Sequence, residues 1–232
     1  MLKLFWRWLL RATVLLIAVV LAYQLWFLLH IWYWVHHNPE NTAFMESRLE
    51  DLRSNNPHGE LKHIWVPYSR ISPHLKRALI AAEDAKFLEH EGFDWESIEQ
   101  AYEKNLRTGK IVAGGSTISQ QLAKNLFLSS NRTPLRKAQE ALITLMLEFM
   151  MDKRRILEIY LNSIEWGNGI FGAEAAARHY YGVSASALSR EQAARLAAMV
   201  PKPRFYDRYR NTTWLTRKTE IILERMNTVE AP

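Results

Sequence analysis

A long apolar stretch near the N-terminus constrains this chain more than any other feature. Residues 12–35 read ATVLLIAVVLAYQLWFLLHIWYWV, and Gln24 and His30 are the polar interruptions. At about 1.5 Å per residue, a helix of this length spans the roughly 30 Å hydrocarbon layer of a bilayer. A cleaved signal peptide is the alternative, but its apolar region is shorter, about 7–15 residues, and small residues follow it. Here aromatic residues 32–34 follow and resemble an interfacial belt, so an uncleaved transmembrane helix is predicted.

The charges on either side of this segment predict its orientation. Lys3, Arg7 and Arg11 precede it, whereas the polar sequence HHNPEN follows it. The positive-inside rule then leaves residues 1–11 in the cytoplasm and the rest of the chain outside, which in a bacterium means a single-pass inner-membrane protein with a periplasmic domain. These three basic residues supply half of the net charge of +6, so a general nucleic-acid-binding surface is not favoured.

The remainder of the chain is predicted to be mainly α-helical. Residues 36–60 are polar and turn-rich and are interpreted as a juxtamembrane linker with a short helical pattern around 43–52. A brief extended piece is expected at 61–68, and helical periodicity dominates from Ser72 onward. The expected helices cover residues 73–90, 94–106, 116–127, 134–151, 152–163, 168–182, 189–199 and 215–226. Residues 61–210 are assigned to one catalytic domain and residues 211–232 to a C-terminal helix.

The first block that indicates chemistry is EDAKFLEHEGFD, residues 83–94. On a continuous helix, Glu83, Phe87 and His90 share one face. A carboxyl group beside an aromatic ring and apolar neighbours has a raised pKa, which suits acid–base catalysis near neutrality. A solvated acidic face with Phe87 in the core would produce the same pattern.

The second block is GGSTISQQLAKN, residues 114–125. Its glycines permit close backbone approach, and the free N–H groups of a helix that begins at Ser116 or Thr117 favour an anion. Thr117, Gln121 and Lys124 fall on one face and form a polar strip suited to a sugar–phosphate ligand. An ordinary capped helix with an exposed polar face is the alternative. A nucleotide phosphate loop is not indicated, because no Gly-Lys-Ser/Thr follows the glycines.

The third block is NRTPLRKAQE, residues 131–140. Arg132, Arg136 and Lys137 are cationic hydrogen-bond donors suited to phosphate. Glu140 lies one helical turn beyond Arg136, so a simple surface ion pair is the competing interpretation.

The order of these blocks identifies a family. A fourth block at 153–182, rich in glycine and small residues, is assigned mostly to packing. The four blocks, with LSREQAA at 188–194 and Pro201, resemble the peptidoglycan glycosyltransferase family in order and spacing, over about residues 65–203. The monofunctional members from Gram-negative bacteria are the most similar subgroup. The sequence has no Ser-x-x-Lys and Lys-Thr-Gly set, so no transpeptidase activity is expected. Ser119 stands where threonine is common and keeps the hydroxyl.

The resemblance implies a fold and a reaction. The fold is a lysozyme-like helical lobe with a small membrane-proximal jaw, placed at about residues 95–115. The reaction is polymerisation of lipid II into β-1,4-linked glycan strands by inverting transfer, with release of undecaprenyl diphosphate. By this carry-over, Glu83 is the general base for the acceptor hydroxyl and Glu140 is a second essential glutamate. Lys124 and Arg132 are expected to contact the diphosphate, with Lys137 nearby.

Further residues and partners follow from the same resemblance. The residues expected to line the cleft are Thr117, Gln120, Gln121 and Asn125. Supporting roles are expected for Asp84, Phe87, His90, Ser116, Lys153, Glu158 and Asn162. No organic cofactor is expected; Mg²⁺ or Mn²⁺ is compatible with carboxylates near a diphosphate, although no Asp/His cluster has metal-ligand spacing. The expected partners are lipid II, the growing glycan strand, the membrane and cell-division or elongation proteins, but not nucleic acid.

Two other functions remain open from the sequence. A lysozyme-like lytic enzyme would also use a glutamate on a helical lobe, with water as the acceptor, but it has no need of cations at a diphosphate. A non-catalytic membrane-anchored scaffold would not require the blocks at 83–94 and 114–125. Long strands, cleaved strands or no product from lipid II would distinguish the three.

Overall fold

The computed structural model describes residues 2–110, 114–128 and 133–232, and these fall into two compact units. The first unit, residues 1–38, consists of the helix α1 (Leu2–His36). This helix is long and apolar enough to cross a membrane, as the sequence predicts. It begins well before residue 12, so residues 2–11 form its first turns.

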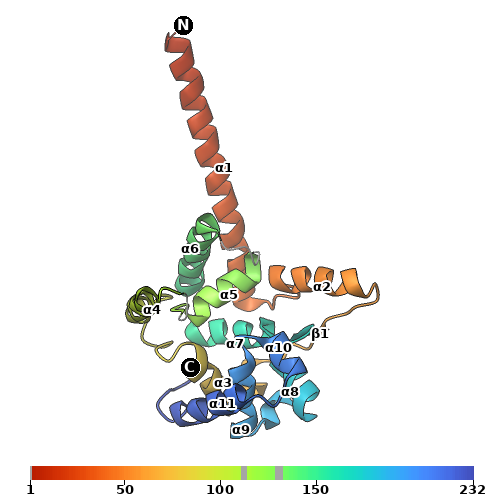
Figure 1. The fold of residues 1–232 in the computed structure, drawn as a ribbon. Helices are drawn as coiled ribbons and strands as arrows, with labels where there is room; N and C mark the ends of the chain where they lie inside the picture. The colour runs from red at the N-terminus through yellow and green to blue at the C-terminus, as the bar shows by residue number, and fades with distance from the viewer. Residues whose placement is uncertain (1, 111–113, 129–132) are drawn as a thin grey trace. The chain divides into compact units, whose positions relative to one another are not determined.

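The second unit, residues 39–232, is mainly helical, as expected, and is drawn with its labels in Figure 1. Its α-helices are α2 (Ala43–Asn55), α3 (Pro73–Glu83), α4 (Trp95–Thr108), α5 (Ile118–Phe127), α6 (Pro134–Met150), α7 (Lys153–Ser163), α8 (Ala173–Tyr181), α9 (Arg190–Met199), α10 (Pro203–Arg208) and α11 (Thr213–Arg225). Short 3₁₀ turns are η1 (Tyr68–Arg70) and η2 (Ala185–Ala187), and the strands are β1 (Lys62–His63), β2 (Glu165–Gly167) and β3 (Ile170–Phe171).

Side-chain caps fix where most of these helices begin. Ser72 accepts a hydrogen bond from the backbone of His74, and Thr133 accepts one from Arg136, each with a proline at the first turn. These contacts satisfy backbone donors that have no partner inside the helix. The helix starts expected at Ser72 and Thr133 are therefore confirmed. The short helix α10, which follows Lys202, was not predicted.

Strands β2 and β3 lie between α7 and α8 in the chain and form a small three-stranded sheet with β1. The strand order is β1-β3-β2, with β1 parallel and β2 antiparallel to β3. The prediction of one helix over 168–182 is wrong in its first part, because α8 begins only at Ala173. Gly169 and Gly172 have positive φ of 71° and 81°, outside the α-helical region, so the chain turns here before α8 begins.

The core is built from two sets of packed helices. Helix α3 packs against α9 and α11, and α5 packs against α6 and α7; Figure 1 shows the first set beside the C-terminus. Helix α2, within the segment interpreted as a linker, packs on α5 and buries Met45. The C-terminal helix α11 likewise belongs to the compact unit, where it buries Leu215 and Ile222.

The helix predicted over 73–90 ends early. Helix α3 stops at Glu83, and Asp84 leaves the helical conformation with φ of −162°. Residues 85–92 form turns and bends. The prediction that Glu83, Phe87 and His90 share a helix face is therefore wrong. Hydrogen bonds to the Asp84 carboxylate, described below, hold the chain in this turn.

Candidate active site

A cavity of about 460 Å³ opens between helices of the second unit. Helix α5 supplies much of one wall, and α2, α6, α7, β2 and the segment before α10 also contribute. Its lining includes the predicted residues Ser116, Gln120, Gln121, Lys124, Asn125, Lys137 and Glu140. It also includes Phe44, Arg48, Leu128, Arg136, Tyr160, Ile164, Glu165, Val200, Pro201 and Pro203.

Glu83 lies at the end of α3 and is linked to this cavity through Gln121. The Gln121 Nε2 atom donates a hydrogen bond of 2.9 Å to Glu83 Oε2. Burial raises the pKa of Glu83, and Asp84 adds to that rise, whereas Gln121, Lys218 and Lys124 oppose it. A carboxyl group with a raised pKa suits a general base working near neutrality.

Lys124 lies on α5, in the cavity wall. Burial lowers its pKa, the neighbouring Arg136 and Lys137 lower it further, and Glu140 and Glu83 oppose the change. The lysine is thus in the electrostatic field of both glutamates. The family resemblance predicts that Lys124 contacts the diphosphate, and that role stays a prediction.

Glu140 is buried, with 3% of its surface exposed. Arg136 Nη1 donates to Glu140 Oε2 at 2.6 Å, and Lys137 Nζ donates to Glu140 Oε1. The pairing with Arg136 that the sequence suggested is present, but it is not a surface pair, because both side chains are largely buried. One carboxylate therefore holds two cations at the cavity wall.

The described part of the chain shows no preformed metal-binding cluster at this cavity. Both carboxylate oxygens of Glu140 already accept hydrogen bonds from cationic side chains. Within residues 2–110, 114–128 and 133–232, no group of three or more His, Cys, Asp or Glu side chains gathers at metal-binding distance. The compatibility of Mg²⁺ or Mn²⁺ with a site that also holds a diphosphate stays a prediction.

Thr117 is the predicted cleft residue that lies elsewhere. Its hydroxyl donates to the carbonyl oxygen of Gly92 at 2.7 Å and accepts from the backbone of Gln120. The Gln120 side chain accepts from the backbone N–H of Thr117, which completes a capping box. Because its hydroxyl is used inside the fold, Thr117 does not line the cavity, and that prediction is wrong.

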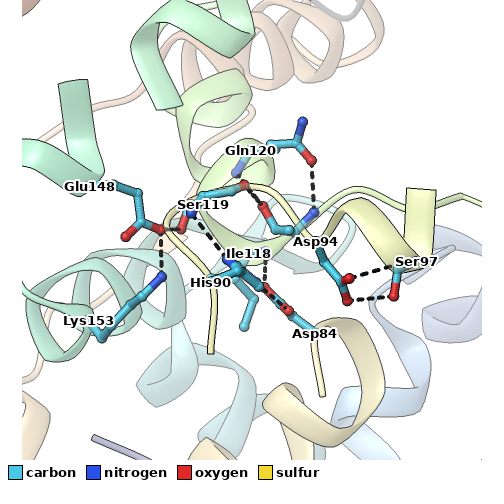
Figure 2. A network of polar contacts seen from close by, with 11 residues as sticks. Asp84, His90, Asp94, Ser97, Ile118, Ser119, Gln120, Glu148 and Lys153 are labelled. Carbon is cyan, nitrogen blue, oxygen red and sulfur yellow. Dashed lines mark hydrogen bonds and ion pairs between the residues drawn. The ribbon is translucent and has the colours of Figure 1, made fainter. Parts of the chain in front are cut away.

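Asp84 and His90 hold the beginning of α5 (Figure 2). Asp84 Oδ2 accepts from the backbone N–H of Ile118 at 2.9 Å, and Oδ1 lies 2.9 Å from His90 Nε2. The backbone N–H of Gly92 donates to His90 Nδ1, so the ring proton is on Nε2 and points at Asp84. These two predicted supporting residues orient the helix that carries Gln121 and Lys124.

A second part of the network in Figure 2 joins α5, α6 and α7. Ser119 Oγ donates to Glu148 Oε1, which also accepts from Lys153 Nζ at 2.7 Å. The Lys153 ammonium lies 4.8 Å from the centre of the buried Phe87 ring. Lys153 therefore connects the buried Phe87 ring to α5 through Glu148 and Ser119.

Glu158 and Asn162 bind the backbone of the extended segment before η1. Glu158 Oε1 accepts from Tyr68 N–H at 2.8 Å, and the Asn162 amide pairs with both the N–H and the C=O of Val66. Both side chains have structural partners, and neither lines the cavity. Arg132 lies outside the described residues.

Sequence reasoning missed several residues of the site. Tyr160 was assigned to packing within the fourth block, but its hydroxyl donates to Gln121 Oε1 at 2.7 Å. Lys218, on the C-terminal helix, acts on the pKa of Glu83. Arg48 Nε donates to the buried Glu165 at 3.2 Å in the cavity wall. The spacing of residues in the sequence did not indicate these contacts, because each residue and its partner lie far apart along the chain.

The fold and the site define a mainly helical domain with a carboxylate-and-cation cleft, joined in one chain to an apolar helix long enough to span a membrane. The transglycosylase family model matches residues 50–227, and the chain belongs to this family.

Relatives named biosynthetic peptidoglycan transglycosylase align over nearly the whole chain. The protein from Nitrosospira multiformis is 65% identical and covers 98% of this chain and 99% of its own. The relatives from Laribacter hongkongensis and Methylobacillus flagellatus are also 65% identical. Their alignments cover 97% and 99% of this chain, respectively, and 99% of each relative.

Proposed function

We propose that this cleft polymerises lipid II into β-1,4-linked glycan strands, with inversion at the donor sugar and release of undecaprenyl diphosphate. The family makes the chain a peptidoglycan glycosyltransferase of cell-wall synthesis. The observation that carries the mechanism is the placement of Glu83, whose pKa is raised by burial, beside Lys124 and the cavity.

Glu83 is proposed as the general base. As a carboxylate it takes the proton from the acceptor 4-hydroxyl while that oxygen forms a bond to the anomeric carbon of the donor. The bond from this carbon to the diphosphate breaks, and its electron pair leaves with the diphosphate. The leaving group needs neutralisation of its charge rather than a proton, which fixed cations supply best.

Lys124 and Lys137 are the described cations proposed to take that role, with Arg132 added by the family resemblance. Glu140 is proposed to keep Arg136 and Lys137 oriented at the cavity wall through its two hydrogen bonds. A carboxylate that holds two cations leaves net positive charge facing a diphosphate. A lytic enzyme that uses water has no need of this arrangement, so glycosyl transfer is favoured.

The membrane is proposed as the place of action. Helix α1 serves as the single-pass anchor, with its N-terminus in the cytoplasm and the catalytic unit in the periplasm. Within the second unit, α4 exposes Trp95, Tyr102 and Leu106, and α6 exposes Leu135 and Phe149. Large exposed apolar groups of this kind mark a surface that contacts lipid or another protein. They support a membrane-proximal jaw that includes α4.

The test is polymerisation of purified lipid II by the full-length protein, with product length as the readout. Glu83→Gln keeps the shape of the side chain and removes the base, so we expect the rate to fall about 10²–10⁴-fold. The chelator EDTA is included in a parallel reaction. Cleavage of preformed strands would favour the lytic alternative, and no activity in any arm would favour the scaffold. A Glu83→Gln variant with normal rates would overturn the assignment of the base.

A further inference from the structure

Three side chains from three helices form a hydrogen-bonded chain that ends on Glu83. Tyr160 of α7 donates its hydroxyl proton to Gln121 Oε1 at 2.7 Å. Gln121 of α5 then donates from Nε2 to Glu83 Oε2, at the end of α3, at 2.9 Å. Tyr160 is 0% exposed, so water does not compete for its hydroxyl.

Chemistry determines which group donates in each of these two hydrogen bonds. An ionised carboxylate accepts hydrogen bonds and cannot donate them, so Gln121 must present its NH₂ group to Glu83. The amide oxygen then faces Tyr160, and a phenol can donate to it. A flipped amide would place its oxygen against the carboxylate oxygen, which is repulsive unless Glu83 carries a proton.

We propose that Tyr160 is a positioning residue, which locks the Gln121 amide so that it donates to Glu83 and holds the ionised carboxylate ready to accept a proton. This inference rests on the proposed role of Glu83 as the base. Tyr160 acts through Gln121 and takes no proton itself. Burial raises its pKa well above the ordinary tyrosine value, so the hydroxyl stays neutral and remains a donor.

Three charged groups in the described part of the chain also act on the pKa of Glu83. Lys218 of α11 and Lys124 of α5 favour its ionised form, and Asp84, its neighbour in the chain, disfavours it. Helix α9, which also packs on α3, has alanine, leucine and methionine as its buried residues. Gln121 opposes the effect of burial more than Lys218 or Lys124 does, so its orientation affects how readily Glu83 ionises.

The experiment is the pH dependence of lipid II polymerisation by full-length Tyr160→Phe. Phenylalanine keeps the ring and removes the hydroxyl, so the amide is free to flip. We expect kcat to fall by about 5- to 10-fold, the worth of one hydrogen bond between neutral groups. We also expect the acid limb of kcat/KM to move to higher pH, because a hydrogen bond that favours the charged form has been weakened. KM should change less than kcat.

A matched control separates this effect from simple loss of a buried hydroxyl. Tyr180 of α8 donates to the backbone oxygen of Trp166 at 2.9 Å and does not line the cavity. Tyr180→Phe should lower the melting temperature without moving the pH profile. Gln121→Ala should move the acid limb in the same direction as Tyr160→Phe. It also carries the test if the Tyr160 variant does not fold.

Double substitution tests whether Tyr160 acts through Gln121. In the Gln121→Ala background, Tyr160→Phe should add little further loss, since the connection is already broken. Unchanged kcat and pH profile in Tyr160→Phe, or fully additive losses, would overturn the proposal. Glu83→Gln distinguishes the two possible failures. If only the positioning role of Tyr160 is wrong, Glu83→Gln is still inactive. If Glu83 is not the base, Glu83→Gln is active.

Discussion

The carboxylate of Asp84 accepts a hydrogen bond of 2.9 Å from the backbone N–H of Ile118. This contact ties the residue after α3 to the first residue of α5. Glu83 and Gln121 are brought within hydrogen-bond distance by the same junction. The base and the helix that carries its partners are thus fixed to each other by an adjacent structural residue.

Removing this junction should destabilise the protein. Asp84→Ala leaves the buried N–H of Ile118 without its acceptor, which costs about 1–3 kcal/mol in the free energy of unfolding. Chemical denaturation of the full-length protein in detergent measures the loss. Asp84→Asn keeps an oxygen acceptor and should lose less. Equal denaturation midpoints for the wild type and the alanine variant would show that the contact contributes nothing.

The pH dependence of activity should report Glu83. Burial raises its pKa above the ordinary glutamate value of 4.5, and a base accepts a proton only when it is ionised. The value of kcat/KM should therefore fall as the pH drops through this raised pKa, at a higher pH than an exposed glutamate would give. Steady-state rates across the acid range measure it, with circular dichroism at each pH to confirm folding. A flat profile down to the ordinary glutamate range contradicts it.

Lys124 should matter for turnover more than for folding. Lys124→Ala removes a cation from the cavity wall, and loss of such a contact to developing charge typically costs about 10²–10³ in kcat. The exposed Lys62 provides a matched control, since Lys62→Ala removes the same charge away from the cavity. If both variants polymerise lipid II at the wild-type rate, the diphosphate binds elsewhere.

Glu140→Gln should lower both stability and activity. The buried carboxylate holds Arg136 and Lys137, and breaking a buried pair by removing one partner costs up to about 3–5 kcal/mol. Activity per folded molecule should also fall, because the two cations lose their orientation. The melting temperature and the rate are measured on the same preparation. A lower melting temperature with specific activity within about twofold of wild type would make the residue purely structural.

The exposed side chain of Phe149 should contribute to membrane contact. It is 90% exposed at the end of α6. Phe149→Ser should reduce the rate on lipid II embedded in vesicles and leave the rate in detergent unchanged, because burial of an aromatic side chain in lipid contributes roughly 1.5–3 kcal/mol. Ser substitution of the equally aromatic but half-exposed Phe205 on α10 is the control. Equal losses in vesicles and detergent would place the effect in the fold.

Much of the local structure could be predicted from the sequence because its causes are local. The apolar run of α1, and the caps at Ser72 and Thr133, depend on residues a few positions apart. The first three blocks contain Glu83, Lys124 and Glu140, and the structure brings Lys124 within electrostatic reach of both glutamates.

Tertiary contacts decided the rest. Helical periodicity continues past Glu83, but hydrogen bonds from Ile118 and His90 to Asp84 end the helix, and their donors lie in other segments. The sequence pattern predicts that the Thr117 hydroxyl faces a ligand. In the folded chain this hydroxyl donates a hydrogen bond to the carbonyl oxygen of Gly92 instead. Tyr160 joins the site because α7 packs on α5. A sequence pattern determines which face of a helix is apolar; which polar group reaches a site depends on partners that only the folded chain brings together.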